Sequence, residues 1–136
     1  MSTRKFAQID TAGWPHQIGH PEFVALVQAY LPEVAARMRE LDATGLLHVA
    51  MGVLEGMTIQ AYNDRLNVAR RYLAFADEVL PRADAAVLNA LDVSFVEGLV
   101  FGGRDQGIRD WMPERLLKEY DAQRKARLSG KDPALG

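Results

Sequence analysis

The longest apolar stretch of the chain covers residues 84–103 and has the period of an α-helix. Asp84 suits the N-cap and Gly102-Gly103 suits the stop, so we predict a helix over residues 85–101. One stripe of large apolar side chains recurs at intervals of three and four: Leu88, Leu91, Phe95 and Leu99. A second stripe runs beside it: Val93, Val96 and Val100. With more than half of its surface apolar, this helix is predicted to be central.

Helical periodicity and helix-boundary residues predict further helices on both sides of this one. The predicted ranges are 21–30, 33–41, 46–61, about 64–80 and 114–128. No alternation typical of a β-strand persists over more than a few residues. We therefore predict an all-α protein, an irregular bundle of five or six helices around a central hydrophobic helix at about residues 85–101. It forms a single helical domain over 20–128, after an irregular arm at 1–19 and before a disordered tail at 129–136.

Several side chains carry local predictions within this bundle. Phe6 and Trp14 are expected to hold the arm against the core, and Leu41 is expected to face inward. Asn63 or Asp64 is expected to cap the helix that follows. The glycines at 52 and 56 lie four residues apart on one helix face, which predicts a close approach of the central helix there.

Composition places the chain among ordinary globular proteins, because 49% of residues are hydrophobic and 25% are charged. A formal net charge of -2 argues against nucleic acid as a partner, since such proteins usually present a strongly basic face. Absence of cysteine excludes disulfides and thiolate chemistry.

A bilayer span needs about 20 mostly apolar residues, and Asp92, Ser94 and Glu97 interrupt the central stretch, so we expect no membrane insertion. With no apolar signal segment at the N-terminus, a cytoplasmic location is predicted.

Glu97 is the residue with the clearest chemical potential, because it lies among apolar residues of the predicted central helix. A buried carboxylate must be paired, hydrogen-bonded or protonated. It is therefore either an acid, base or recognition group in a cleft, or one half of a structural ion pair. The candidate pocket around it comprises four residues: Glu97, His48, Glu55 and Asp92.

These pocket residues do not have the spacing of a metal site. His48 and Glu55 share a helix face but lie seven residues apart, whereas paired helical ligands lie within one turn. Ser94 has no nucleophile elbow around it. The glycine-rich segment at 102–107 follows a helix, whereas phosphate-binding loops precede one. We accordingly predict no catalytic residues, no metal and no cofactor.

Three short motifs give the chain a family resemblance. They are Leu31-Pro32-Glu33, Val93-Ser94-Phe95-Val96-Glu97-Gly98-Leu99 and Met112-Pro113-Glu114-Arg115-Leu116. Over about residues 22–120 the chain resembles a widespread family of small, all-helical, uncharacterised bacterial proteins. Some proteins of this general kind are immunity proteins that neutralise a cognate bacterial toxin. The resemblance implies such a role for this chain.

The sequence thus favours a protein-binding module over an enzyme. A basic partner protein, for which a toxin is the candidate, would meet the acidic side chains of the body: Glu33, Glu40, Asp42, Asp64, Asp77 and Glu78. The alternative is an enzyme or small-ligand protein that uses Glu97 in a pocket between helices. The apolar pattern thins after Tyr120, which permits a dimer without requiring one.

Overall fold

A computed structural model describes residues 5–102 and 107–128, and within these ranges the protein is an all-α bundle, as predicted. Its helices are α1 (His20–Tyr30), α2 (Pro32–Glu40), α3 (Leu47–Asp64), α4 (Leu66–Val79), α5 (Ala85–Leu91), α6 (Glu97–Gly102) and α7 (Glu114–Leu128). Two short 3-10 helices lie at Leu80–Arg82 and Gly107–Trp111. A π-helical turn, Asp92–Val96, joins α5 to α6 in one continuous helix, here called the α5–α6 helix.

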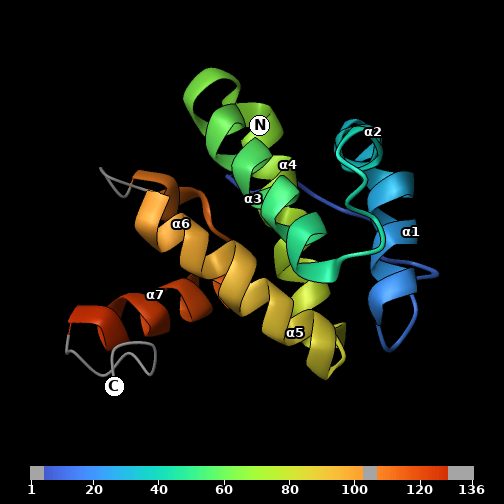
Figure 1. The fold of residues 1–136 in the computed structure, drawn as a ribbon. Helices are drawn as coiled ribbons and strands as arrows, with labels where there is room; N and C mark the ends of the chain where they lie inside the picture. Colours follow the sequence, from blue (N-terminus) through green and yellow to red (C-terminus); the bar gives the residue numbers. More distant parts are fainter. Residues whose placement is uncertain (1–4, 103–106, 129–136) are drawn as a thin grey trace.

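The helices α3 and α4 form a hairpin in the middle of the bundle (Figure 1). On one side of this hairpin lie α1 and α2, and the α5–α6 helix crosses α3 (Figure 1). Helix α7 packs against α4, α6 and the π turn. Proline and glycine residues set two of the boundaries, as predicted: Pro32 begins α2 one residue after the end of α1, and α6 ends at Gly102.

The most enclosed helix is α4, in contrast to the predicted central position of the α5–α6 helix. Its buried residues extend well beyond one seam: Ala69, Tyr72, Leu73, Ala74, Phe75, Ala76, Asp77 and Val79. Neighbours on two sides account for this burial, because both α3 and α7 pack against α4. The side predicted to face solvent is only partly covered: Arg65, just before α4, is exposed, and Arg70, Arg71 and Glu78 are half-buried.

The α5–α6 helix buries one face and exposes the other. Leu91, Phe95 and Leu99 are fully buried, as predicted. Leu88 is 38% exposed and Val93 is 50% exposed, so the predicted enclosure of both stripes is wrong at these two positions. The helix lies on the outside of the α3–α4 hairpin, which leaves its outer face in solvent (Figure 1).

By length and composition this continuous helix, Ala85–Gly102, could cross a membrane, contrary to the expectation that the stretch is too short and too interrupted. Its 18 residues have a mean hydropathy of 1.5, and 39% of them are buried inside the bundle. Core helices of soluble proteins have the same length and composition, so this property assigns no location.

The π turn of this helix was not apparent from the sequence. The Asp92 carbonyl oxygen accepts the backbone N–H of Glu97, five residues on, so one turn is wider than an α-helical turn. Gln123 of α7 donates its side-chain amide to the same oxygen at 2.8 Å. This contact from α7 gives the Asp92 carbonyl oxygen a second hydrogen-bond partner.

Close helix packing uses different glycines from those predicted. A side chain at Gly52 or Gly56 would meet nothing within 4 Å, so the prediction for these positions is wrong. The tight positions are on the opposite helix. A Cβ at Gly98 would lie 2.8 Å from side-chain atoms of Glu55, and one at Gly102 would lie 2.6 Å from Ile59 Cδ1. Glycine in α6 therefore makes room for side chains of α3.

The predicted caps and the predicted inward-facing residues have mixed outcomes. The Asp84 carboxylate accepts the Val87 N–H at 2.9 Å, which confirms it as the N-cap of α5. Asn63 and Asp64 do not cap α4, because they belong to the last turn of α3 and one residue, Arg65, separates the two helices. Leu41 is 50% exposed rather than inward-facing.

The N-terminal arm is irregular over the described residues 5–19, as predicted. Trp14 is buried, with its ring centroid 5.4 Å from that of Tyr30 and 5.7 Å from that of Phe75. Phe6 is half-buried. Backbone hydrogen bonds between Ile18 and the segment after α4 complete the attachment of the arm. The predicted tail at 129–136 and Gly103 lie outside the described residues.

Candidate functional site

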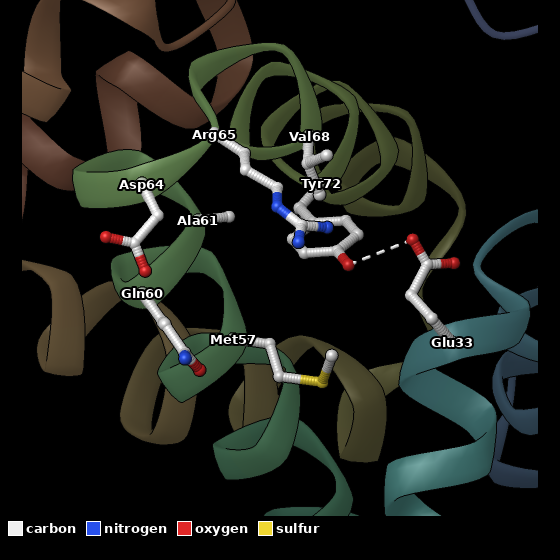
Figure 2. A pocket seen from close by; sticks show the side chains of 8 residues that line it. All are labelled: Glu33, Met57, Gln60, Ala61, Asp64, Arg65, Val68 and Tyr72. Atoms are coloured by element: carbon white, nitrogen blue, oxygen red, sulfur yellow. Dashed lines mark hydrogen bonds between the residues drawn. The ribbon is translucent and has the colours of Figure 1, made fainter.

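A cavity of about 320 Å³ lies where α2, α3 and α4 meet (Figure 2). Its lining residues are Glu33, Met57, Gln60, Ala61, Asp64, Arg65, Val68 and Tyr72. The sharp α3–α4 connection through Arg65 brings side chains from the end of α3 and the start of α4 to one place. The lining combines apolar groups with both signs of charge, and it contains no serine, cysteine or histidine. It is suited to binding rather than to nucleophilic chemistry.

A buried phenol forms part of the cavity wall. Tyr72 is 2% exposed, and its hydroxyl donates to Glu33 Oε2 at 3.0 Å (Figure 2). Arg71 forms an ion pair with the same carboxylate oxygen. Burial, followed by the neighbouring Glu33 carboxylate, raises the pKa of Tyr72 to about 12. The phenol therefore stays neutral near pH 7 and acts as a fixed hydrogen-bond donor.

Three polar side chains of the cavity are unengaged. Within the described part of the chain, Gln60, Asp64 and Arg65 make no side-chain hydrogen bond or ion pair. The Arg65 side chain extends from the start of α4 toward the middle of the lining (Figure 2). These groups are available to a ligand without loss of an internal interaction.

The four residues of the predicted pocket do not line this cavity. His48 Nδ1 lies 2.9 Å from Ser94 Oγ, which joins the start of α3 to the π turn. Glu55 packs against Gly98, and its burial raises the pKa of its carboxyl above the ordinary value. Glu97 is half-buried. No group of three or more metal-ligating side chains occurs among residues 5–102 and 107–128.

Asp92, the fourth predicted residue, faces α7 instead. Its carboxyl is near that of Glu119, and its pKa is raised to about 6, first by burial and then by repulsion from Glu119. Two carboxylates in contact favour a shared proton, so this pair resists full ionisation. The structure therefore gives Asp92 a position between helices rather than one in the predicted pocket.

This carboxyl pair predicts a pH-dependent stability. Because the folded state holds the Asp92 proton more tightly than the unfolded state, its contribution to stability is present at low pH and is lost as pH rises through about 6. We expect Asp92→Asn to be more stable than the wild type at pH 7, by about 1 kcal/mol after solvent screening, and to lose this advantage near pH 4. Urea denaturation of both proteins across this range measures the difference. An unchanged difference between the two proteins would contradict the assignment.

The six acidic residues predicted to meet a partner do not form one surface. Glu33 and Asp64 line the cavity, and Glu40 and Asp42 are exposed at the end of α2 and just after it. Asp77 is 6% exposed and bonds to Arg115 and to the Leu116 N–H, so its carboxylate is engaged inside the protein. Glu78 contacts Arg82 and Arg115. Asp77 is thus buried and engaged inside the protein, unlike the exposed carboxylates of Glu40 and Asp42.

The connection between α2 and α3 exposes large aliphatic side chains. Leu41 is 50% exposed, Leu46 is 59% exposed and Val49 is 47% exposed. This α2–α3 corner, defined as residues 40–49, also carries the exposed carboxylates of Glu40 and Asp42. Sequence reasoning missed the corner because Leu41 fits the inward stripe of α2.

Comparison with known proteins gives one result that concerns most of the chain. Residues 24–126 match the family described as Domain of unknown function (DUF7674). The chain belongs to this family. The DUF7674 region begins within α1 and ends within α7, so it contains the cavity, the α2–α3 corner and the π turn. It agrees with the predicted resemblance to a family of uncharacterised proteins over about residues 22–120. No curated protein and no solved structure matches the chain.

Proposed function

We propose that this member of the DUF7674 family is a protein-binding module whose docking surface is the α2–α3 corner. The observation that carries the proposal is the exposure of Leu41, Leu46 and Val49, each about half or more, within nine residues of chain. Apolar side chains gathered on a surface and edged by polar groups are typical of protein interaction sites. Their burial by a partner would supply the apolar centre of an interface.

The corner is held in place before any partner binds. Ala43 is buried, and its N–H donates to the Met38 carbonyl at 2.8 Å. His20 of α1 donates Nε2–H to the Thr44 carbonyl, also at 2.8 Å. Because these contacts fix the backbone between Leu41 and Leu46, little conformational entropy is lost on docking. The exposed leucines are thus presented by an ordered segment.

Charge favours a basic partner. Glu40 and Asp42 flank Leu41, and both are exposed. The Glu40 carboxylate pairs with Arg37 on the surface at 2.9 Å, a contact that solvent weakens and a partner's cation can replace. Asp42 forms the turn after α2 with a positive φ of 53°, a conformation that aspartate tolerates better than most residues, and its side chain is exposed within the corner. Carboxylates around an apolar centre attract and orient a positively charged protein.

The resemblance to immunity-type proteins extends the proposal to a cognate bacterial toxin as the partner and to the bacterial cytoplasm as the location. An acidic, apolar-centred surface would suit a toxin whose own active face is basic, as in a nuclease that binds phosphate. Neutralisation would then follow from occlusion of that face. Neither step requires a cofactor.

Site-resolved crosslinking tests the proposal. A photo-crosslinking amino acid at Leu46 should capture one defined protein in host cells, whereas the same group at Phe101 should not. Both positions are 59% exposed, and they lie in different parts of the fold, Leu46 just before α3 and Phe101 in α6, so they form a matched pair. The captured protein is then purified and its affinity for the intact chain is measured by calorimetry.

With that partner, Leu46→Asp should weaken binding by at least about tenfold, the effect of losing a central apolar contact. Phe101→Asp should leave the affinity within about twofold of the wild type, because it lies outside the corner. Equal weakening by the two variants, or crosslinks at Phe101 alone, would rule out the corner as the docking surface.

A further inference from the structure

We propose that the cavity between α2, α3 and α4 is a binding site for a small zwitterion, a free amino acid with an apolar side chain. This site is separate from the α2–α3 corner, and the inference does not depend on protein docking there. Three properties of the cavity support this proposal: its size, the presence of both apolar and polar walls, and the charged side chains of both signs on its lining that make no ion pair within the described residues.

Size restricts the ligand to a small molecule. At about 320 Å³, the cavity lies at the lower end of the range of about 300–1,000 Å³ found for small-molecule sites. Three different helices contribute to its walls, so the hollow lies between packed elements rather than along one helix surface (Figure 2). A molecule the size of an amino acid matches these dimensions.

Four side chains form an apolar wall that would contact the side chain of the ligand: Met57, Ala61, Val68 and the ring of Tyr72. Met57 is flexible at its thioether end, which lets the wall adapt to aliphatic or aromatic groups. Figure 2 shows its sulfur lying on the side of the cavity nearer to Glu33. An apolar side chain against this wall would displace water from hydrocarbon surface.

Arg65 is the residue that would bind the carboxylate of the ligand. Its guanidinium makes no ion pair within the described residues, although a planar guanidinium is well suited to two parallel hydrogen bonds with a carboxylate. Gln60 contributes an amide from the adjacent turn of α3. A ligand carboxylate would therefore satisfy donors that are otherwise solvated.

Two carboxylates, those of Asp64 and Glu33, lie on opposite sides of the lining and offer alternative positions for the ammonium group of the ligand (Figure 2). Asp64 is unengaged within the described residues. Glu33 uses Oε2 for both Tyr72 and Arg71, which leaves Oε1 as an acceptor for a ligand ammonium. An anion alone would be repelled by these two groups and a cation alone by Arg65. Only a ligand with both charges complements the whole lining.

Calorimetric titration of the full chain with leucine, methionine and phenylalanine tests the inference. At least one should bind with a dissociation constant below about 1 mM. Its N-acetyl derivative, which lacks the ammonium, and its amide, which lacks the carboxylate, should each bind at least about tenfold more weakly. The methyl NMR signal of Met57 should shift on titration, which locates the ligand.

Arg65→Gln should weaken binding of the free amino acid at least about tenfold and should remove the difference between the acid and its amide. The matched control is Arg39→Gln, an exposed arginine of α2 outside the cavity lining. It should bind like the wild type. Saturation by none of the three amino acids, equal binding of the N-acetyl derivative, or equal loss in both variants would overturn the inference. Leu46→Asp should leave amino-acid binding unchanged, which separates this test from that of protein docking.

Discussion

Replacement of Phe95 by alanine is expected to lower the free energy of unfolding by about 3–5 kcal/mol. Phe95 is fully buried in the π turn, between α3 and α7, and belongs to the main hydrophobic core. Truncation removes most of a ring from a packed interior and leaves a space that neighbouring side chains fill only in part. Urea denaturation monitored by circular dichroism measures the loss as a lower transition midpoint.

Val93→Ala is the matched control for this prediction. Val93 lies two residues earlier in the same turn but is 50% exposed, so its truncation should change stability by no more than about 0.5 kcal/mol. Comparable losses in the two variants would indicate that the turn itself, rather than burial of the ring, determines stability. A Phe95→Ala protein that unfolds at the wild-type midpoint would contradict the assignment of this residue to the core.

Asp77→Ala is expected to lower the free energy of unfolding by about 2–3 kcal/mol, because two buried or partly buried partners lose their acceptor. Asp77 Oδ1 accepts the Leu116 N–H at 2.9 Å, and Oδ2 accepts Arg115 Nη2 at 2.8 Å. The carboxylate of α4 thus caps the first turn of α7, where backbone N–H groups lack partners within the helix and the dipole favours negative charge.

Hydrogen exchange distinguishes this capping role from a general loss of stability. In Asp77→Ala the amide of Leu116 and its neighbours in the first turn of α7 should exchange faster than those of α3. Glu78→Ala is the control, because Glu78 also pairs with Arg115, at 2.7 Å, but its carboxylate is partly solvated. It should cost less than about 1 kcal/mol, as surface ion pairs do. If the two substitutions cost the same, the cap does not stabilise α7.

The predicted pocket and the observed cavity have different residues for an identifiable reason. Glu97 was predicted as a site residue because it lies in an apolar stretch. The sequence does not determine which face of that helix the neighbouring helices cover. The cavity residues Arg65 and Tyr72 carried no comparable signal: Arg65 fits an ordinary solvated face, and Tyr72 lies outside the predicted seam of α4. Glu33 is 31 residues away from Asp64, so only the packing of α2 against the hairpin brings them to one cavity.

By itself the sequence determined the all-α class, the bounds of α1, α2 and α7 to within one residue, the Asp84 cap and the buried stripe through Phe95. These features depend on local chemistry: proline and glycine restrict the backbone, a carboxylate caps adjacent amides, and apolar spacing marks a face. Tertiary structure alone decided the enclosure of α4, the close packing at Gly98, the α7 cap by Asp77 and the cavity. Each of these arises where residues far apart in the chain meet, and the geometry of that meeting depends on how all the helices pack together.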